Sequence, residues 1–256
     1  MTSARSPEKL QRLLSGEAVF GIMQTMPSPT VTELAVWSGF DFVVLDCEHG
    51  IVDESAHLAS LQAVAGTDAF AMVRVRPGDL GAVGRYLDFG ADGVLMSDVG
   101  TAQDAMNFVA AATHGPVGTR SSTGRSSRAE RYGLNPSSEM PRYILMGLIE
   151  SRESVSNISA IAQTPGLDGL VIGHQDLSGS LGCSGDYSES VYSAALREVE
   201  QAAVGANRML GGAPYPGSPV ERLLSAGYQL IVAGVDTIAL RDGFEAQLAA
   251  AKRIRD

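Results

Sequence analysis

The sequence is poor in cysteine, in basic residues and in long apolar runs, and each shortage excludes a class of protein. Two cysteines among 256 residues, Cys47 and Cys183, cannot build a disulfide framework or a structural zinc site. Nineteen Lys and Arg against 29 Asp and Glu give a net charge of −10, and phosphate binding needs clustered cations. No apolar run approaches the roughly 18 residues of a membrane span, and the N-terminus lacks the apolar core of a signal peptide. We therefore expect a cytoplasmic globular protein that binds neither nucleic acid nor membrane.

Short apolar runs alternate with segments of helical periodicity along the whole chain. Their continuous apolar character is typical of parallel strands buried on both faces, and Thr30, Asp53 and Thr101 are typical helix N-caps. The expected strands are residues 19–23, 41–46, 71–75, 93–97, 143–149, 169–173, 208–213 and 229–234. The expected helices are a short leading helix in residues 1–20, then residues 30–38, 53–65, 79–89, 101–113, 153–162, 189–206, 217–226 and 236–254.

Eight strand–helix pairs in about 250 residues predict an α/β protein, a (β/α)8 TIM barrel that occupies residues 1–256 as one domain. An open, doubly wound sheet has the same alternation and stays open as the alternative. The GxGxxG and GxxxxGK[ST] motifs of nucleotide-binding folds are absent.

Residues 114–142 interrupt the alternation with a long segment rich in Gly, Ser and Arg. A loop of this length in a compact domain is usually functional or mobile. One interpretation is a solvated surface loop, and the other is a lid that brings positive charge to an anionic substrate. The arginines that such a lid would contribute are Arg120, Arg125, Arg128, Arg131 and Arg142.

Polar residues gather where the predicted strands end, which is where barrel enzymes place their chemistry. An unpaired charge on a buried strand costs several kcal/mol, so these groups are expected to have partners. Acids with one His and one Arg indicate a site for a metal and an anion, and oxygen ligands favour a hard ion such as Mg²⁺ or Mn²⁺. The residues are Asp46–Gly50, Arg74, Ser97 and Asp98, Glu150, Gly173–Asp176 and Asp236.

Several of these stretches resemble the HpcH/HpaI aldolases, a family of class II pyruvate aldolases that includes 2-dehydro-3-deoxyglucarate aldolase and macrophomate synthase. The stretches are GFDFVVLDCEHG, VRVRPGD, LDFGADGVLM, GLIESRESVSNISAIAQTPGLDGLVIGHQDLSGSLG and AGVDT. The resemblance runs from about residue 18 to residue 245, and the motifs D-x-E-H-G, I-E-[ST] and D-L-S-x-x-x-G in this order are highly specific. It implies a barrel of the phosphoenolpyruvate/pyruvate-domain type.

The resemblance also implies roles for the strand-end residues. Glu150 and Asp176 match the two ligands of a divalent metal ion, Mg²⁺, Mn²⁺ or Co²⁺, which acts as a Lewis acid on a 2-oxo acid. His49 matches the general base, and Asp46 matches the carboxylate that orients it. Arg74 matches the arginine that stabilises enolate charge.

Each of these residues also has a purely structural interpretation. Glu150 could belong to a buried ion pair, Asp176 could cap the following turn, and Asp46 could cap the next helix. Arg74 could form a salt bridge inside the barrel with Asp46 or Asp88. The resemblance places Asp88 near the histidine of an adjacent site, and Glu48 is a candidate supporting group beside His49 and Asp46.

The chain departs from the family pattern around the substrate. Ser97–Asp98 replaces a Pro and an apolar residue, Leu148 replaces a Gln, and Gly173–His174–Gln175–Asp176 replaces G-P-x-D. Gly118–Ser121 and Gly212–Pro216 also differ from the usual pattern. The expected substrate-binding residues are Gly173, His174, Gln175, Leu148, Ser97, Ala213 and Arg120. His57 and His114 are expected on the surface.

We therefore expect a carbon–carbon lyase, a metal-dependent aldolase that cleaves or forms a 2-oxo acid aldol through a metal-stabilised enolate of pyruvate or a similar oxo acid, with an aldehyde as partner. The alternatives are a biosynthetic decarboxylase or carbon–carbon-forming synthase of the same family and, disfavoured because all the polar residues are present, a non-catalytic acid-binding barrel. The predicted strands carry no Lys, so a Lys-imine mechanism lacks an obvious nucleophile.

The C-terminal helix, residues 236–256, bears on assembly. Ile238, Leu240, Phe244, Leu248 and Ala251 form an apolar stripe at helical spacing. The stripe could cover its own barrel or be exchanged with another chain, and an exposed stripe implies an obligate oligomer. Relatives that the resemblance points to are hexamers, trimers of dimers, so we expect a homo-oligomer in which Asp88 and part of the Arg-rich loop reach a neighbouring site.

Overall fold

The computed structural model describes residues 8–123, 125–134 and 142–253, and within them the chain forms a closed barrel of eight parallel strands in sequential order. The strands are β1 Val19–Gln24, β2 Phe42–Asp46, β3 Phe70–Val75, β4 Gly93–Met96, β5 Ile144–Ile149, β6 Gly169–Ile172, β7 Met209–Gly212 and β8 Leu230–Val235. The predicted barrel is therefore confirmed, and the open sheet is wrong. Parts of the predicted leading helix, of the Arg-rich loop and of the last helix lie outside the described residues.

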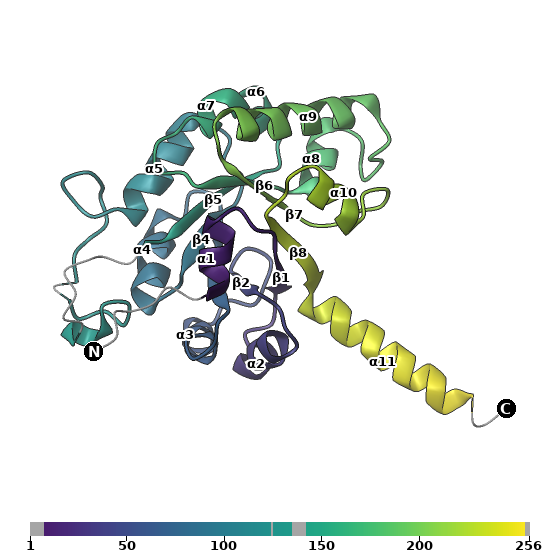
Figure 1. Ribbon diagram of the computed structural model, residues 1–256, viewed down its shortest axis with the longest axis horizontal. Coiled ribbons are helices and arrows are strands. Elements are labelled where there is room, and N and C mark those ends of the chain that lie inside the picture. Colours follow the sequence, from purple (N-terminus) through teal and green to yellow (C-terminus); the bar gives the residue numbers. More distant parts are fainter. Residues whose placement is uncertain (1–7, 124, 135–141, 254–256) are drawn as a thin grey trace.

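Most of the helices surround the barrel, and the last one projects away from it, as Figure 1 shows. They are α1 Glu8–Leu14, α2 Pro29–Trp37, α3 Glu54–Val64, α4 Leu80–Phe89, α5 Ala102–Ala112, α6 Arg152–Ser156, α7 Ile158–Ala162, α8 His174–Leu181, α9 Ser190–Gly205, α10 Val220–Ser225 and α11 Asp236–Lys252. Asp53 and Thr101 are N-caps as expected, whereas α2 is capped by Ser28, so Thr30 lies inside that helix. Two details differ from the prediction: the helix expected at 153–162 divides at Asn157 into α6 and α7, and α8 was not predicted.

Two apolar cores hold the barrel together. Inside it, strand side chains such as Phe42, Phe70 and Met146 are almost fully buried, and α1 adds Leu10 and Leu13 to this inner core. A larger core fills the space between the strands and the surrounding helices. The inner core explains one glycine, because a Cβ on Gly21 would stand 2.3 Å from the Phe42 ring. Packing inside the barrel therefore leaves no room for a side chain there.

His57 belongs to the outer layer of this packing and not to the surface, so its predicted exposure is wrong. Its side chain is buried on α3, with Nδ1 2.9 Å from the Tyr86 hydroxyl of α4 and 3.6 Å from the Cys47 Sγ. A partner on the neighbouring helix thus turns an apparently surface histidine inward. His114 is half-buried, with Nδ1 3.2 Å from the Arg120 carbonyl oxygen.

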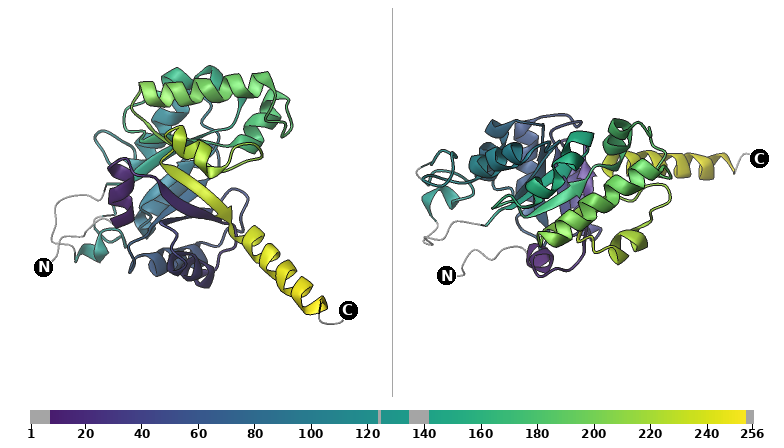
Figure 2. Two further views of the ribbon diagram at one scale, coloured as in Figure 1. Left: turned by 45° about the vertical axis from the view of Figure 1, so that its right-hand side comes forward. Right: turned by 90° about the horizontal axis from the view of Figure 1, so that it is seen from above.

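α11 does not cover its own barrel. It leaves the end of β8 and projects away from the rest of the molecule in both views (Figures 1 and 2). Every described residue of α11 after Asp236 is exposed, including Ile238, Phe244 and Leu248. No helix in the described part of the chain is long and apolar enough to cross a membrane.

Candidate active site

Asp46 and Arg74 form a buried ion pair at the carboxyl ends of β2 and β3. The two residues are direct partners in the β2–β3 register, which places their side chains together. Arg74 Nε donates to Asp46 Oδ1 at 2.8 Å, and Nη2 donates to Oδ2 at 2.6 Å. Burial disfavours the ionised form of Asp46, but the hydrogen bond and positive charge of Arg74 outweigh it and lower the pKa of Asp46. The pair predicted as an alternative role for Arg74 is therefore present.

Asp46 also fixes the backbone that carries His49. Its Oδ1 accepts hydrogen bonds from the amides of Glu48, at 2.9 Å, and His49, at 3.3 Å. The side chain of His49 is 65% exposed, and its Nε2 lies 3.8 Å from Glu48 Oε2. In the single chain, Asp46 thus positions the main chain at His49, while the carboxylate nearest the imidazole is that of Glu48.

Glu48 joins three strands of the site, a role that the sequence did not reveal. Its Oε2 accepts from the Ser97 hydroxyl, beyond β4, at 2.6 Å and lies 3.1 Å from Arg74 Nη1. Ser97 is fully buried, so its hydroxyl orients Glu48 and does not face the cavity described below. Arg74 is consequently held by two carboxylates at once.

Glu150 follows directly after β5 and is almost completely buried, at 8% exposure. Its Oε1 accepts a hydrogen bond of 2.9 Å from the amide of Asp98, whose φ of 41° lies in the left-handed region. Burial first, and then the charges of Glu48 and Asp176, raise the pKa of Glu150 to about 7. The ionised carboxylate therefore lacks a compensating positive charge.

Asp176 lies in the first turn of α8, one strand further around the barrel. The N-cap of α8 is Gly173, so the capping role considered for Asp176 is wrong. Gly173 has a different importance, because a Cβ there would stand 2.7 Å from Glu150 Oε2. Its missing side chain leaves room for the Glu150 carboxylate beside Asp176.

This pair of acids fits a divalent cation. Both candidate ligands are oxygens. Burial and then the acidic neighbours raise the pKa of Glu150, and a cation between Glu150 and Asp176 would relieve the repulsion between these two carboxylates. No cluster of three or more His, Cys, Asp or Glu side chains suited to a metal ion occurs in the part of the chain that the structure describes. A site with two protein carboxylates keeps its remaining positions for substrate oxygens and water.

A cavity of about 460 Å³ brings most of the predicted residues together. Its size falls within the range of small-molecule sites, about 300–1,000 Å³. The predicted residues that line it are Arg74, Leu148, Glu150, Gly173, His174, Gln175, Asp176 and Ala213. Burial lowers the pKa of His174 to about 3, so this ring is neutral. Asp46 and Ser97 lie behind the lining.

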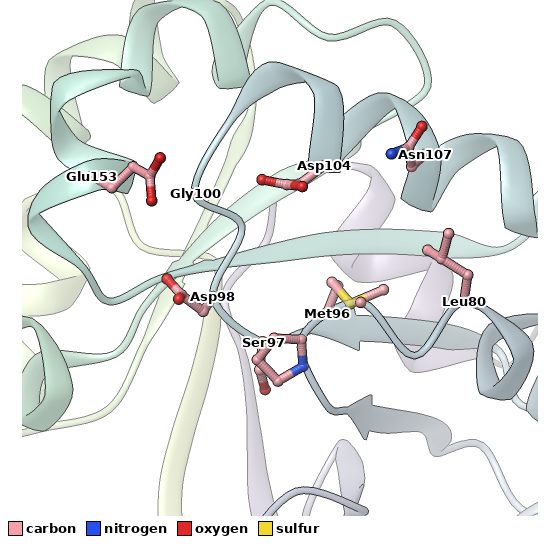
Figure 3. A pocket seen from close by; sticks show the side chains of 10 residues that line it. Leu80, Met96, Ser97, Asp98, Gly100, Asp104, Asn107 and Glu153 are labelled. Carbon is pink, nitrogen blue, oxygen red and sulfur yellow. The ribbon is translucent and has the colours of Figure 1, made fainter.

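A smaller hollow of about 330 Å³ lies next to the site, between the segments that follow β3 and β4. Figure 3 shows Asp98, Asp104 and Glu153 around it, contributed by the segment after β4, by α5 and by α6. Asp104 completes a capping box with Thr101 at the start of α5. Its carboxylate is thus used in the local structure of the helix.

Arg120 and Asp88 lie at the other end of the barrel. Asp88 is in the last turn of α4, and helices of this fold run opposite to the strands, so that turn is near the amino ends of the strands. Arg120 pairs with Asp88 Oδ1 at 2.5 Å, and its guanidinium lies 5.1 Å from the centre of the Tyr143 ring. The part of the loop around Arg120 is therefore not a lid over its own site, and within one chain Arg120 cannot bind substrate there. Its Arg128 is also anchored, donating to the Phe89 carbonyl oxygen at 2.6 Å.

Among the cavity residues that the sequence analysis did not predict are two tyrosines. Tyr187, between α8 and α9, and Tyr215, between β7 and α10, both line it beside His174. The signal for Tyr215 was present in the unusual Gly212–Pro216 stretch, where two prolines flank the tyrosine. No sequence pattern indicated Tyr187, because the order of elements along the chain does not reveal that the α8–α9 connection lies beside the site.

Comparison with known proteins finds relatives over nearly the whole chain. The chain is 32% identical to a hydroxypyruvate/pyruvate aldolase from Pseudomonas aeruginosa, over 90% of this chain and 87% of the relative. A crystal structure of an HpcH/HpaI aldolase/citrate lyase family protein from Burkholderia cenocepacia J2315 has a TM-score of 0.87 and 27% identity, over 98% of this chain and all of the other. The citrate synthase SbnG has a TM-score of 0.85 and 25% identity, over 98% of this chain and all of the other.

The sequence model of one family, HpcH/HpaI aldolase/citrate lyase, matches residues 22–242. This match and the aldolases among the relatives confirm the predicted family and the predicted class of carbon–carbon lyase. The chain belongs to the HpcH/HpaI aldolase/citrate lyase family.

Proposed function

We propose that this protein is a metal-dependent aldolase that cleaves or forms the C3–C4 bond of a 4-hydroxy-2-oxo acid. The products of cleavage are pyruvate, or a similar small 2-oxo acid, and an aldehyde. The observation that carries the proposal is the placement of Glu150, Asp176 and Arg74 on the wall of one cavity. Two acids suited to a divalent cation and one arginine are what a 2-oxo acid requires, because it presents two oxygens to a cation and gains negative charge during the reaction.

A Mg²⁺, Mn²⁺ or Co²⁺ ion held by Glu150 and Asp176 would supply Lewis-acid stabilisation of the charge that develops on the 2-oxo oxygen. Arg74 adds positive charge at the same oxygen. Its contacts with Asp46 and Glu48 fix the position of the guanidinium before substrate binds. His49 is exposed and is not among the residues that line the cavity; we assign it the role of base, which takes the proton of the C4 hydroxyl when C3–C4 breaks and returns a proton in the reverse direction.

The assembly follows from α11. Its exposed apolar side chains, Ile238 at 47%, Phe244 at 65% and Leu248 at 56%, are a liability on a monomer. We propose that α11 packs on a neighbouring barrel in a homo-oligomer, a hexamer built as a trimer of dimers. Asp88 and part of the Arg-rich loop then reach the site of another chain. We place this oligomer in the cytoplasm, in line with the two free cysteines.

A second candidate uses the same site to join an oxo acid to another carbonyl compound, or to decarboxylate one. The similarity to the citrate synthase SbnG favours keeping this synthase reading. Both candidates form an enolate, by loss of a methyl proton, by cleavage of the C3–C4 bond or, in a decarboxylation, by loss of CO2. They differ in which of these steps forms the enolate and in the compound that it then joins. Oxaloacetate decarboxylation that outpaces every aldol reaction would favour the second candidate.

The test is exchange of the pyruvate methyl protons for deuterium, followed by NMR. We expect exchange that EDTA abolishes and Mg²⁺, Mn²⁺ or Co²⁺ restores, and that Glu150→Gln and Asp176→Asn remove. Glu198→Gln, an exposed acid on α9, is the matched control and keeps the wild-type rate. Exchange that persists in EDTA, or borohydride trapping of a pyruvate–enzyme adduct, would overturn the proposal.

A further inference from the structure

Three aromatic rings form one wall of the cavity that also holds Glu150 and Asp176. The ring centres of His174 and Tyr215 are 4.2 Å apart, and those of Tyr187 and Tyr215 are 4.6 Å apart. All three line the cavity, and they come from α8, from the α8–α9 connection and from the β7–α10 connection. His174 and Asp176 are two residues apart, so this aromatic wall adjoins the proposed metal site.

The wall is held in place before any ligand binds. Tyr215 lies between Pro214 and Pro216, and its amide and carbonyl exchange hydrogen bonds of 3.2 and 2.8 Å with Ser218. Behind the wall, the fully buried Tyr192 hydroxyl lies 2.6 Å from His174 Nδ1. A rigid aromatic surface loses little conformational entropy when a flat ring packs against it.

The Tyr187 hydroxyl is also engaged, because it donates to Gln175 Oε1 at 3.0 Å. This bond ties the α8–α9 connection to the first turn of α8. It leaves the ring of Tyr187, and not its hydroxyl, as the main contribution of this residue to the cavity.

The remaining walls of the cavity offer little to a charged or hydroxylated ligand. Leu148, Val171 and Val232 contribute apolar side chains from β5, β6 and β8. Among the described residues that line the cavity, Arg74 is the one Lys or Arg, and the proposed function assigns it to the 2-oxo acid. A second carboxylate or a phosphate on the ligand would therefore have no further cationic side chain among the residues of this chain that line the cavity, whereas an apolar ring has the aromatic wall.

We infer that the aldehyde partner of this enzyme carries a neutral aryl group, which packs against Tyr187 and Tyr215. The inference rests on the proposed aldolase function and names its substrate class. In the synthetic direction, the pyruvate methyl carbon loses a proton and bonds to the aldehyde carbon, whose oxygen gains a proton. Pyruvate and an arylacetaldehyde thus give a 5-aryl-4-hydroxy-2-oxopentanoate, with no oxidation or reduction.

The experiment compares three aldehydes, each with its formyl group on an sp³ carbon, as acceptors for pyruvate in the metal-loaded enzyme: phenylacetaldehyde, glyceraldehyde and succinic semialdehyde. Differences in apolar fit are worth about 10- to 200-fold in kcat/KM. We expect phenylacetaldehyde to exceed each of the others by about tenfold or more. An equal or greater kcat/KM for glyceraldehyde or succinic semialdehyde overturns the inference. Pyruvate methyl exchange, measured beside it, tests the proposed function separately because it needs no aldehyde.

Variants locate the preference on the wall. Tyr187→Leu and Tyr215→Leu should each lower the ratio of phenylacetaldehyde to glyceraldehyde kcat/KM at least fivefold, whereas Tyr215→Phe should retain it. The ratio is internal to each variant, so general losses of activity cancel. Trp37→Leu, at an exposed aromatic residue that ends α2, is the matched control and should keep the wild-type ratio. An unchanged ratio in both wall variants overturns the assignment.

A binding measurement that needs neither metal nor turnover completes the test. Saturation-transfer NMR should show 2-phenylethanol binding to the metal-free wild-type enzyme through its aryl protons, and the signal should fall at least threefold in Tyr187→Leu. Equal transfer to wild type and Tyr187→Leu would contradict the placement of the aryl group.

Discussion

Replacing Asp46 by asparagine tests the central ion pair of the site. The Asp46 side chain is completely buried and that of Arg74 is 12% exposed, so the variant leaves a guanidinium without one of its two carboxylates in a largely dry environment. Removing one partner of a buried pair costs about 3–5 kcal/mol. Glu48 still faces Arg74 at 3.1 Å, and the asparagine oxygen can still accept from the backbone amides, so we expect the lower value, about 3 kcal/mol.

For a chain of this size, each kcal/mol lowers the melting temperature by about 2–4 °C, so Asp46→Asn should melt about 6–12 °C below wild type. The assay is differential scanning calorimetry together with urea unfolding. Glu54→Gln is the matched control: it breaks an ion pair of 2.8 Å with Arg85 whose side chains are 43% and 47% exposed, and should cost at most about 1 kcal/mol.

The same variant has a catalytic consequence. Because Asp46 holds the guanidinium at two points, Arg74 loses its fixed orientation, and pyruvate methyl exchange should fall at least about tenfold. A melting temperature within 2 °C of wild type, or full exchange, would refute the view that the Asp46–Arg74 pair is both structurally and functionally important.

Three further predictions concern His49, Asp92 and helix α11. His49→Ala should lower aldol cleavage by about 10²- to 10⁴-fold with metal affinity unchanged in calorimetry, and near-full turnover would contradict its role as base. Burial raises the pKa of Asp92 to about 6, so the folded protein loses stability as the pH rises from about 4 to 6. The free energy of unfolding of Asp92→Asn should therefore exceed that of wild type by about 1–2 kcal/mol at pH 8 and equal it below pH 4. A gain in melting temperature that is independent of pH would contradict this. Deleting the chain after Asp236 should give inactive, smaller particles in light scattering, and a fully active wild-type monomer would contradict the exchange of α11.

The strands were predicted within one or two residues because buried parallel strands are apolar on both faces and stand out from the polar segments around them. The segment expected at residues 41–46 is Phe42–Asp46, for example. α8 was missed for the opposite reason: its sequence, HQDLSGSL, is short, polar and without helical periodicity. Its stability comes from the barrel that it covers, through buried residues such as Leu177 and Leu181.

The sequence predicted site residues that lie beside each other at the ends of neighbouring strands. It did not predict contacts that depend on a long side chain extending past a neighbouring strand. Asp46 and Arg74 follow from neighbouring strand ends. The bond between Glu48 and Ser97 depends on a side chain that crosses β3 to reach β4, which spacing along the chain does not encode. The position of Arg120 could have been inferred from chain order, because a connection from a helix to the next strand lies at the amino ends of the strands.

This difference separates two kinds of residue in the cavity. The acids and Arg74 that serve the oxo acid lie at or just beyond strand ends, and the barrel fixes their separation through hydrogen-bonded register. Tyr187 and Tyr215 lie on connections, whose length and sequence can change without altering the barrel. The reaction of the oxo acid therefore depends on the strand ends, and the choice of aldehyde depends on the connections. Substituting the residues of the β7–α10 connection should change the preferred aldehyde. Exchange of the pyruvate methyl protons should still require Glu150 and Asp176.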